Sequence, residues 1–247
     1  MKSVLITIVI AALAQAGGDT GMEGLLRRSD VGAFAPSSFR ARLIIGNPAD
    51  GKTHALEIWR SGGDKTLVRF LDAKDRGKYL LRIDSEVWLL TPDAKKPVHL
   101  SPSYRLYGGA TLDAILGTRL AGAYRVERVT RERQAGRDAV VFELRAKSDG
   151  LLFWQVRYVV AEASERAITA VYRLRSGREA TAVDFLEWNE RPIYARRLIV
   201  RDLLRKGAQA DITVSELQER VIADGLFSLD DGTARRALDS PVVQNQQ

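Results

Sequence analysis

The sequence contains no cysteine and only two histidines, His54 and His99, among its 247 residues. The absence of cysteine excludes a disulfide framework, a thiolate nucleophile, an iron–sulfur cluster and a zinc site with cysteine ligands. The two histidines lie far apart in the sequence, so a histidine-rich metal site is not expected. We therefore expect a protein without a metal ion or other cofactor.

Motifs of catalytic chemistry are also missing. The sequence has no G-x-S-x-G elbow, no P-loop, no H-E-x-x-H and no G-x-G-x-x-G. Ser101 follows His99 by two residues, but this spacing is common by chance. Paired carboxylates such as Asp72 and Asp75 lie beside turn residues or basic neighbours, where solvated turns are the simpler interpretation. We predict that the protein is not an enzyme.

Only the N-terminus carries a long hydrophobic run. Residues 4–13 form a run of ten residues that is apolar except for Thr7, preceded by Met1-Lys2 and followed by Ala14-Gln15-Ala16. This order is typical of a secretory signal peptide with an A-x-A cleavage site. A membrane anchor is the alternative, but so short a run spans too little of a bilayer core of about 30 Å. We predict a cleaved signal at residues 1–16 and export to the periplasm.

The charge balance is basic, with 38 Lys+Arg against 31 Asp+Glu and a formal net charge of +7. Such a balance raises nucleic acid or an anionic membrane surface as partners. Export argues against nucleic acid. An anionic membrane surface or an acidic docking partner is therefore the better explanation of the charge.

Period-two alternation dominates the chain after residue 35. Leu56 and Ile58 fall on one side of an extended segment, for example, and Glu57 and Trp59 fall on the other. Turn-forming residues separate the runs. Runs of this kind occupy residues 40–45, 55–60, 66–71, 78–84, 87–91, 124–133, 139–147, 152–161, 168–175, 181–190, 194–201 and 211–216. About a dozen strands with tight connections predict one antiparallel, meandering sheet, which must curl into a barrel or split into a sandwich.

Three segments are expected to be helical instead. Residues 23–34 predict a short amphipathic helix that ends before Pro36, and residues 233–238 predict another near the C-terminus. Residues 102–120 have helical spacing, with Gly108-Gly109 separating two short pieces. We expect a single domain over residues 17–240 and a disordered tail at 241–247.

The central part of the sequence resembles the LolA-like outer-membrane lipoprotein-sorting proteins, and more closely the uncharacterised branch of that family. The resemblance extends over residues 25–205, and its strongest part is the strand–proline–strand–helix order around Trp88, Pro92 and Gly108-Gly109. The stretches that carry it are EIWRSGGDKTLVRF at 57–70, DRGKYLLRI at 75–83, VWLLTPDAKKPVHLS at 87–101 and YRLYGGATLDAI at 104–115.

This resemblance implies a mostly β fold with a few helices, namely an unclosed antiparallel β-barrel of about eleven strands with a helical lid. It also implies a periplasmic carrier that binds acyl chains of lipoproteins or other lipids in an apolar cavity. Such a carrier takes its cargo from an inner-membrane export permease and passes it toward the outer membrane. In the family an early arginine holds the lid closed. Arg60 and Arg69 both lie in the right region, and the resemblance assigns the role to neither.

Two sets of residues are candidates for the lipid site. Core filling is the alternative for each aromatic residue, and the sequence leaves open which side of each strand faces the cavity. The candidates for the cavity wall are Trp59, Phe70, Trp88, Trp154 and Tyr172. The candidates for the cavity side of the lid are Leu106, Tyr107, Leu112, Ile115 and Leu116.

Two other classes of function remain open at this stage. A periplasmic sensor or adaptor of an export or signalling complex would share the fold and read lipid state through a protein partner. An enzyme acting on lipid or glycan is the second, but it has no candidate residues beyond the weak pairs above.

Overall fold

The structure, a computed structural model, describes residues 21–34, 36–62, 64–101, 104–107, 110–112, 119–134, 136–229, 232, 235 and 238. For residues 31–34 only the backbone is described. The expected signal peptide at 1–16 and the expected tail at 241–247 lie outside the described residues. Of the helix expected at 233–238, only Arg235 and Leu238 are described.

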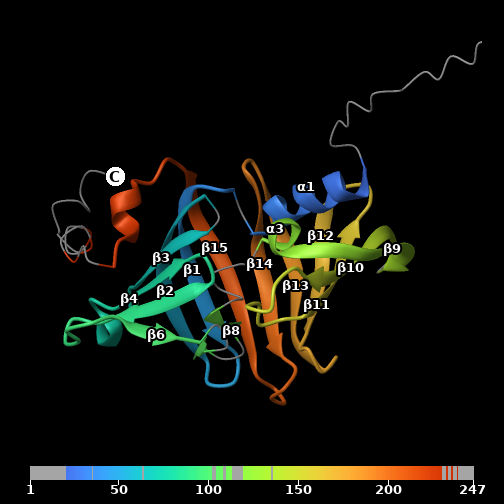
Figure 1. Ribbon diagram of the computed structural model, residues 1–247. Helices are drawn as coiled ribbons and strands as arrows, with labels where there is room; N and C mark the ends of the chain where they lie inside the picture. The colour runs from blue at the N-terminus through green and yellow to red at the C-terminus, as the bar shows by residue number, and fades with distance from the viewer. Residues whose placement is uncertain are drawn as a thin grey trace, which may run out of the picture.

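One large antiparallel sheet forms the body of the protein (Figure 1). Its thirteen strands follow the order β6-β5-β4-β3-β2-β1-β15-β14-β13-β12-β11-β10-β9. The strands are β1 (Phe39–Asn47), β2 (Lys52–Ser61), β3 (Lys65–Phe70), β4 (Tyr79–Ile83), β5 (Glu86–Leu90), β6 (Val98–Leu100), β9 (Tyr124–Gln134), β10 (Arg137–Ala146), β11 (Gln155–Ala161), β12 (Arg166–Arg173), β13 (Glu179–Glu190), β14 (Ile193–Asp202) and β15 (Gln209–Glu219).

The sheet is curved and does not close, because β6 and β9 are its two edges and do not pair with each other (Figure 1). The mostly β fold with an unclosed antiparallel barrel is therefore confirmed. Each of the twelve runs of alternating residues coincides with a strand of this sheet. The thirteenth strand, β6, has only three residues, too few for a period to be recognised.

The helical prediction for residues 102–120 is wrong in its first half. Arg105–Tyr107 is a strand, β7, which pairs antiparallel with β8 (Ala110–Thr111) in a separate two-stranded sheet. Leu106 and Tyr107 therefore reach the interior from a strand, since their backbone bonds across to β8 instead of along a helix. A short helix, α3 (Leu120–Ala123), follows.

The helix expected at 23–34 is confirmed as α1 (Met22–Phe34), which packs against β12, β14 and α3. Leu25, Leu26, Ser29 and Asp30 are buried, at the spacing that places them on one helical face. Two single-turn 3₁₀ helices, η1 (Ala73–Asp75) and η2 (Asp224–Phe227), complete the fold. No helix among the described residues is both long enough and apolar enough to cross a bilayer.

The two faces of the sheet have different covers. We call the face under α1 and α3 the inner face, and the face under η2 the outer face (Figure 1). Successive residues of a strand point to opposite faces. In β2, Leu56 and Ile58 belong to the large inner cluster, whereas Trp59 belongs to a smaller outer cluster with Phe227 of η2.

Candidate functional site

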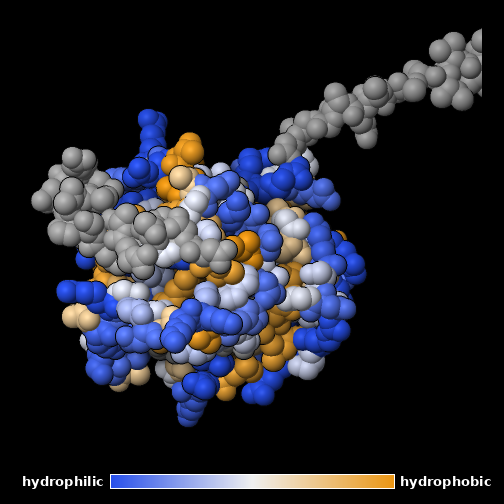
Figure 2. Space-filling view, turned by 60° about the vertical axis from the view of Figure 1, so that its left-hand side comes forward, coloured by the Kyte–Doolittle hydropathy of each residue, from blue (hydrophilic) through white to orange (hydrophobic). Residues whose placement is uncertain are grey.

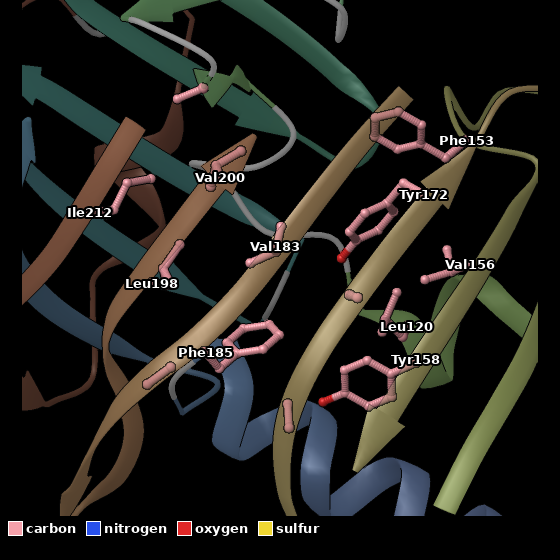
Figure 3. Close-up of a cluster of buried hydrophobic side chains, with 14 of the residues drawn as sticks. Leu120, Phe153, Val156, Tyr158, Tyr172, Val183, Phe185, Leu198, Val200 and Ile212 are labelled. Carbon is pink, nitrogen blue, oxygen red and sulfur yellow. The ribbon is translucent and has the colours of Figure 1, made fainter. Parts of the chain in front are cut away.

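The inner face carries a continuous cluster of buried apolar side chains, which we call the inner core. Figure 3 shows Tyr158, Tyr172 and Phe185 projecting from neighbouring strands on the same side of the sheet. Many of its members are completely buried, and Leu56, Leu80 and Val200 all have zero exposed surface. The cluster reaches from β5, next to one edge of the sheet, to β9 at the other edge. It is the largest apolar environment among the described residues and the best candidate for contact with a lipid chain.

Helices α1 and α3 cover the inner core at one end. Leu25 and Leu26 of α1 and Leu120 of α3 are buried in it. Tyr158 from β11 donates its hydroxyl hydrogen bond to the Ser29 carbonyl of α1, at 3.1 Å. The helices thus lie against the sheet mainly through side-chain packing.

The two-stranded sheet β7–β8 covers a second part of the inner core (Figure 1). Leu106 and Tyr107 pack against the inner core, and Leu112 is completely buried in it. We call α1, α3, residues 104–107 and residues 110–112 together the cover. The other two lid candidates, Ile115 and Leu116, lie outside the described residues.

Polar contacts hold β7 at the rim of the inner face. Arg105 donates from Nε to Asp202 at the end of β14, at 2.6 Å, and the Asp202 side chain is almost fully buried. The Tyr107 ring stacks on His54 of β2, with centroids 3.7 Å apart. Burial raises the pKa of Tyr107, with the nearby Asp75 adding to the shift. This part of the cover is therefore attached by a small number of specific contacts.

The five wall candidates do not lie together. Phe70 and Tyr172 belong to the inner core. Trp154 is half-buried at its border, where the guanidinium of Arg175 lies over the ring at 4.3 Å from the centroid. Arg145 lies over the same ring at 5.7 Å.

Trp59 and Trp88 lie on the outer face. The pairing of Trp59 with Leu67, of Leu67 with Leu81 and of Leu81 with Trp88 places all four side chains on one side of the sheet. That side is opposite to Phe70, because Phe70 differs from Leu67 by an odd number of positions in the same strand. The five aromatic residues therefore cannot form a single wall.

The described residues that follow β15, namely 220–229, 232, 235 and 238, cover part of the outer face, and we call them the C-terminal segment. Ile222 and Phe227 pack on Trp59, Leu67, Tyr79 and Leu81. Tyr79 donates its hydroxyl hydrogen bond to the Arg235 carbonyl at 3.1 Å. Because these contacts bury Trp59, its burial does not indicate a lipid site.

A groove of about 770 Å³ lies on the outer face beside this segment. Its lining includes Arg40, Glu57, Arg69 and Leu238. Glu57 is buried and accepts hydrogen bonds from Arg40, at 2.6 Å from Nε, and from Arg69, which also donates to the Leu238 carbonyl. The groove is thus bounded by ion pairs, and the Arg69 guanidinium links its wall to the C-terminal segment.

Arg60 and Arg69, the two candidates for the arginine that holds the lid closed, lie on different faces of the sheet. Arg69 lies on the outer face with Glu57, whereas Arg60 is buried on the inner face, 3% exposed. Arg60 continues the series of Leu56 and Ile58 along β2, so its side of the strand was readable from the alternation. Of the two, only Arg60 lies beneath the cover.

Arg60 belongs to a buried polar cluster that the sequence reasoning missed. Asp30 of α1 interacts electrostatically with Arg60 and Arg119, and its Oδ2 accepts a hydrogen bond from the Ala121 backbone N–H at 3.0 Å. Burial raises the pKa of Asp30 to about 6, although the Ala121 and Leu120 amides act in the opposite direction. Burial also lowers the pKa of Arg60 to about 9, with Arg82 and Arg119 contributing. We call Asp30, Arg60 and Arg119 the buried polar cluster.

Metal binding has no support from the described residues, in which no group of three or more histidine, aspartate or glutamate side chains could hold an ion.

Comparison with other proteins agrees with this architecture. A family model described as "Uncharacterized protein" matches residues 62–231, which is more than half of the chain. No curated protein matches the chain.

Solved structures with the same fold exist. A LolA superfamily protein from Nitrosomonas europaea has a TM-score of 0.76 and 22% identity, over 83% of this chain and 96% of that chain. An outer membrane lipoprotein-sorting protein domain from Vibrio parahaemolyticus has a TM-score of 0.67 and 15% identity, over 83% and 95% of the two chains. The chain therefore belongs to this family of uncharacterized proteins, and its fold is that of the LolA superfamily structure and of the lipoprotein-sorting domain.

Proposed function

We propose that the protein is a periplasmic carrier that binds the acyl chains of lipoproteins or other lipids at its inner core. It would receive its cargo from an inner-membrane export permease and pass it toward the outer membrane. On this proposal it is a carrier and not an enzyme. The observation that carries the proposal is a continuous apolar inner core, whose cover at β7 is attached by a few polar contacts.

The energetics of lipid transfer explain why such a site is needed. Exposing an alkyl chain to water costs about 0.8 kcal/mol per CH₂. A chain of about sixteen carbons therefore costs on the order of 12 kcal/mol when it crosses water unprotected. An apolar interior offsets this cost, and a movable cover allows release of the cargo.

In Figure 2, apolar residues reach the surface in a band across one face, with hydrophilic residues on either side. The inner face offers Phe70 and Tyr172 as wall residues, and Leu106, Tyr107 and Leu112 as cover residues. Trp59 and Trp88 are left out of the proposed site because they lie on the outer face.

The proposal predicts that Leu112→Asp abolishes binding of a fluorescent fatty-acid probe. Leu112 has no exposed surface and belongs to the inner core, so a charge there opposes docking of both the cover and an acyl chain. Binding is measured by titrating purified protein into the probe. Circular dichroism checks that the sheet remains.

Val221→Asp is the matched control, because Val221 is 93% exposed and its charge should leave probe binding unchanged. Lipids extracted from the protein purified from periplasm are identified in parallel by mass spectrometry. Absence of both co-purified lipid and probe binding would exclude the carrier function.

A further inference from the structure

The guanidinium of Arg119 has an unusual environment. Its Nε and Nη2 atoms are buried and have no hydrogen-bond partner. These two atoms form the edge with which arginine binds carboxylates and phosphates through parallel hydrogen bonds. A buried pair of donors without an acceptor costs free energy in this state and calls for an explanation.

Other arginines of the same chain use this edge for carboxylates. Arg28 donates from Nε and Nη2 to the two oxygens of Glu165, both at 2.7 Å. Arg197 donates from the same two atoms to Asp211. Arg119 therefore has the same pair of donor atoms as Arg28 and Arg197, but no carboxylate of the described residues accepts hydrogen bonds from them.

Arg119 lies among other charged side chains. Arg119 and Arg82 both act on Arg60 and lower its pKa, whereas Asp30 acts on Arg60 in the opposite direction. Asp30 is 3% exposed, and its Oδ1 atom is also without a hydrogen-bond partner.

The polar cluster adjoins the inner core directly. Leu120, the residue after Arg119, is completely buried in the inner core, and Leu26 lies one helical turn before Asp30. An amphiphile with its alkyl chain along the inner core could therefore place its polar end at Arg119.

We propose that the Nε–Nη2 edge of Arg119, supported by Arg60, is a receptor for the oxyanion of an amphiphilic cargo. This inference rests on the proposed carrier function and adds the chemical class of the cargo. Because the edge is buried in this structure, the oxyanion enters when the cover moves, and it then satisfies the unpartnered donors. A fatty-acid carboxylate and a lipid phosphate share this chemistry.

The test compares ligands that share one alkyl chain and differ at the polar end. Dodecanoate, dodecyl phosphate and the neutral dodecanol are titrated against the full chain by displacement of a neutral solvatochromic dye. We expect at least one of the two anions to bind about tenfold more tightly than dodecanol. The preferred anion identifies whether a carboxylate or a phosphate is the source.

Variants then assign the preference to Arg119. Arg119→Gln should bring both anions to the affinity of dodecanol, while the affinity for dodecanol stays within about twofold. Arg119→Lys keeps the charge but loses the paired donors, so it should restore little of the preference. Arg128→Gln, which removes an exposed arginine of β9, should preserve it.

The outcomes separate the two proposals. Equal affinity of the unmodified protein for all three ligands overturns the oxyanion receptor but leaves the carrier function in place. A preference that survives Arg119→Gln also overturns it. Failure of all three ligands to bind contradicts the carrier function itself. The comparison in the unmodified protein stands even where a variant fails to fold.

Discussion

At the scale of single residues, the informative positions are polar groups inside an apolar interior. Asp30 and Arg60 are both 3% exposed. Burying charge in such a place is costly unless the groups are paired. The cluster is only partly satisfied, since Asp30 Oδ1 and two nitrogens of Arg119 lack partners. A closed state of this kind is less stable than its apolar contacts alone would make it.

The protonation of Asp30 leads to a prediction on pH and stability. Its pKa rises from 3.8 to about 6 on folding, chiefly through burial. The folded state therefore binds the proton more tightly, and the free energy of unfolding falls as pH rises from about 4 to about 6. Over this range the free energy of unfolding changes by an amount on the order of 3 kcal/mol through Asp30. Asparagine does not titrate, so the stability of Asp30→Asn should lack this pH-dependent change.

Urea unfolding of both proteins at several pH values across this range provides the measurement. The other carboxylates titrate in both proteins, so their effects cancel in the difference between the two free energies of unfolding. The unmodified protein should gain more stability than Asp30→Asn on acidification. Parallel pH profiles would show that Asp30 titrates normally.

At the scale of elements, the cover combines two kinds of attachment. Helices α1 and α3 lie on the sheet through buried leucines, whereas β7 is held by Arg105 and Tyr107 at the rim. Apolar packing is spread over many atoms, but an ion pair can be lost in one step. We therefore expect the cover to open first at β7–β8.

A cysteine probe tests this order of opening. Leu112→Cys supplies the only thiol, because the sequence has no cysteine, and the site is completely buried. Adding Arg105→Ala removes the guanidinium that pairs with the buried Asp202 and leaves that carboxylate with the Leu204 backbone N–H, which donates to its Oδ1. This loss costs about 1–3 kcal/mol and should raise the rate of maleimide labelling by about tenfold or more.

Adding Arg131→Ala to Leu112→Cys is the control for this experiment. It removes an ion pair with Glu162 in which both side chains are exposed, so the labelling rate should stay near that of Leu112→Cys alone. If Arg105→Ala has no larger effect than this control, the Arg105–Asp202 pair does not hold the cover.

At the scale of the whole molecule, the net charge of +7 favours encounters with anionic surfaces. Exposed arginines concentrate on the edge strand β9, at positions 125, 128, 131 and 133. Each basic residue near an anionic membrane contributes about 1 kcal/mol, and salt screens the attraction. A carrier that visits membranes would gain from such a surface.

We predict that the protein co-sediments with vesicles containing phosphatidylglycerol at low ionic strength and is released at high ionic strength. Vesicles of phosphatidylcholine alone should bind little. The double variant Arg128→Glu and Arg133→Glu should weaken binding more than Lys95→Glu with Lys96→Glu, which makes the same change of charge at another exposed site. Equal losses would indicate that net charge acts without a preferred surface.

The sequence by itself determined the twelve long strands and α1. Period-two alternation and the turn residues between runs are local properties, so all twelve long strands were predictable within a few residues. The three short strands were not, because β6, β7 and β8 have three residues or fewer and no readable period. The resemblance of residues 57–115 to LolA-like proteins was also a property of the sequence, and the fold confirms it.

The tertiary structure decided which face of each strand became the interior. Alternation divides Phe70 from Trp59 but does not say which faces the cover, because both are bulky and apolar. The C-terminal segment buried Trp59 from the outer side, a contact between residues far apart in the sequence. Asp30, Arg60 and Arg119 meet for the same reason, since only the curvature of the sheet and the docking of two helices bring them together.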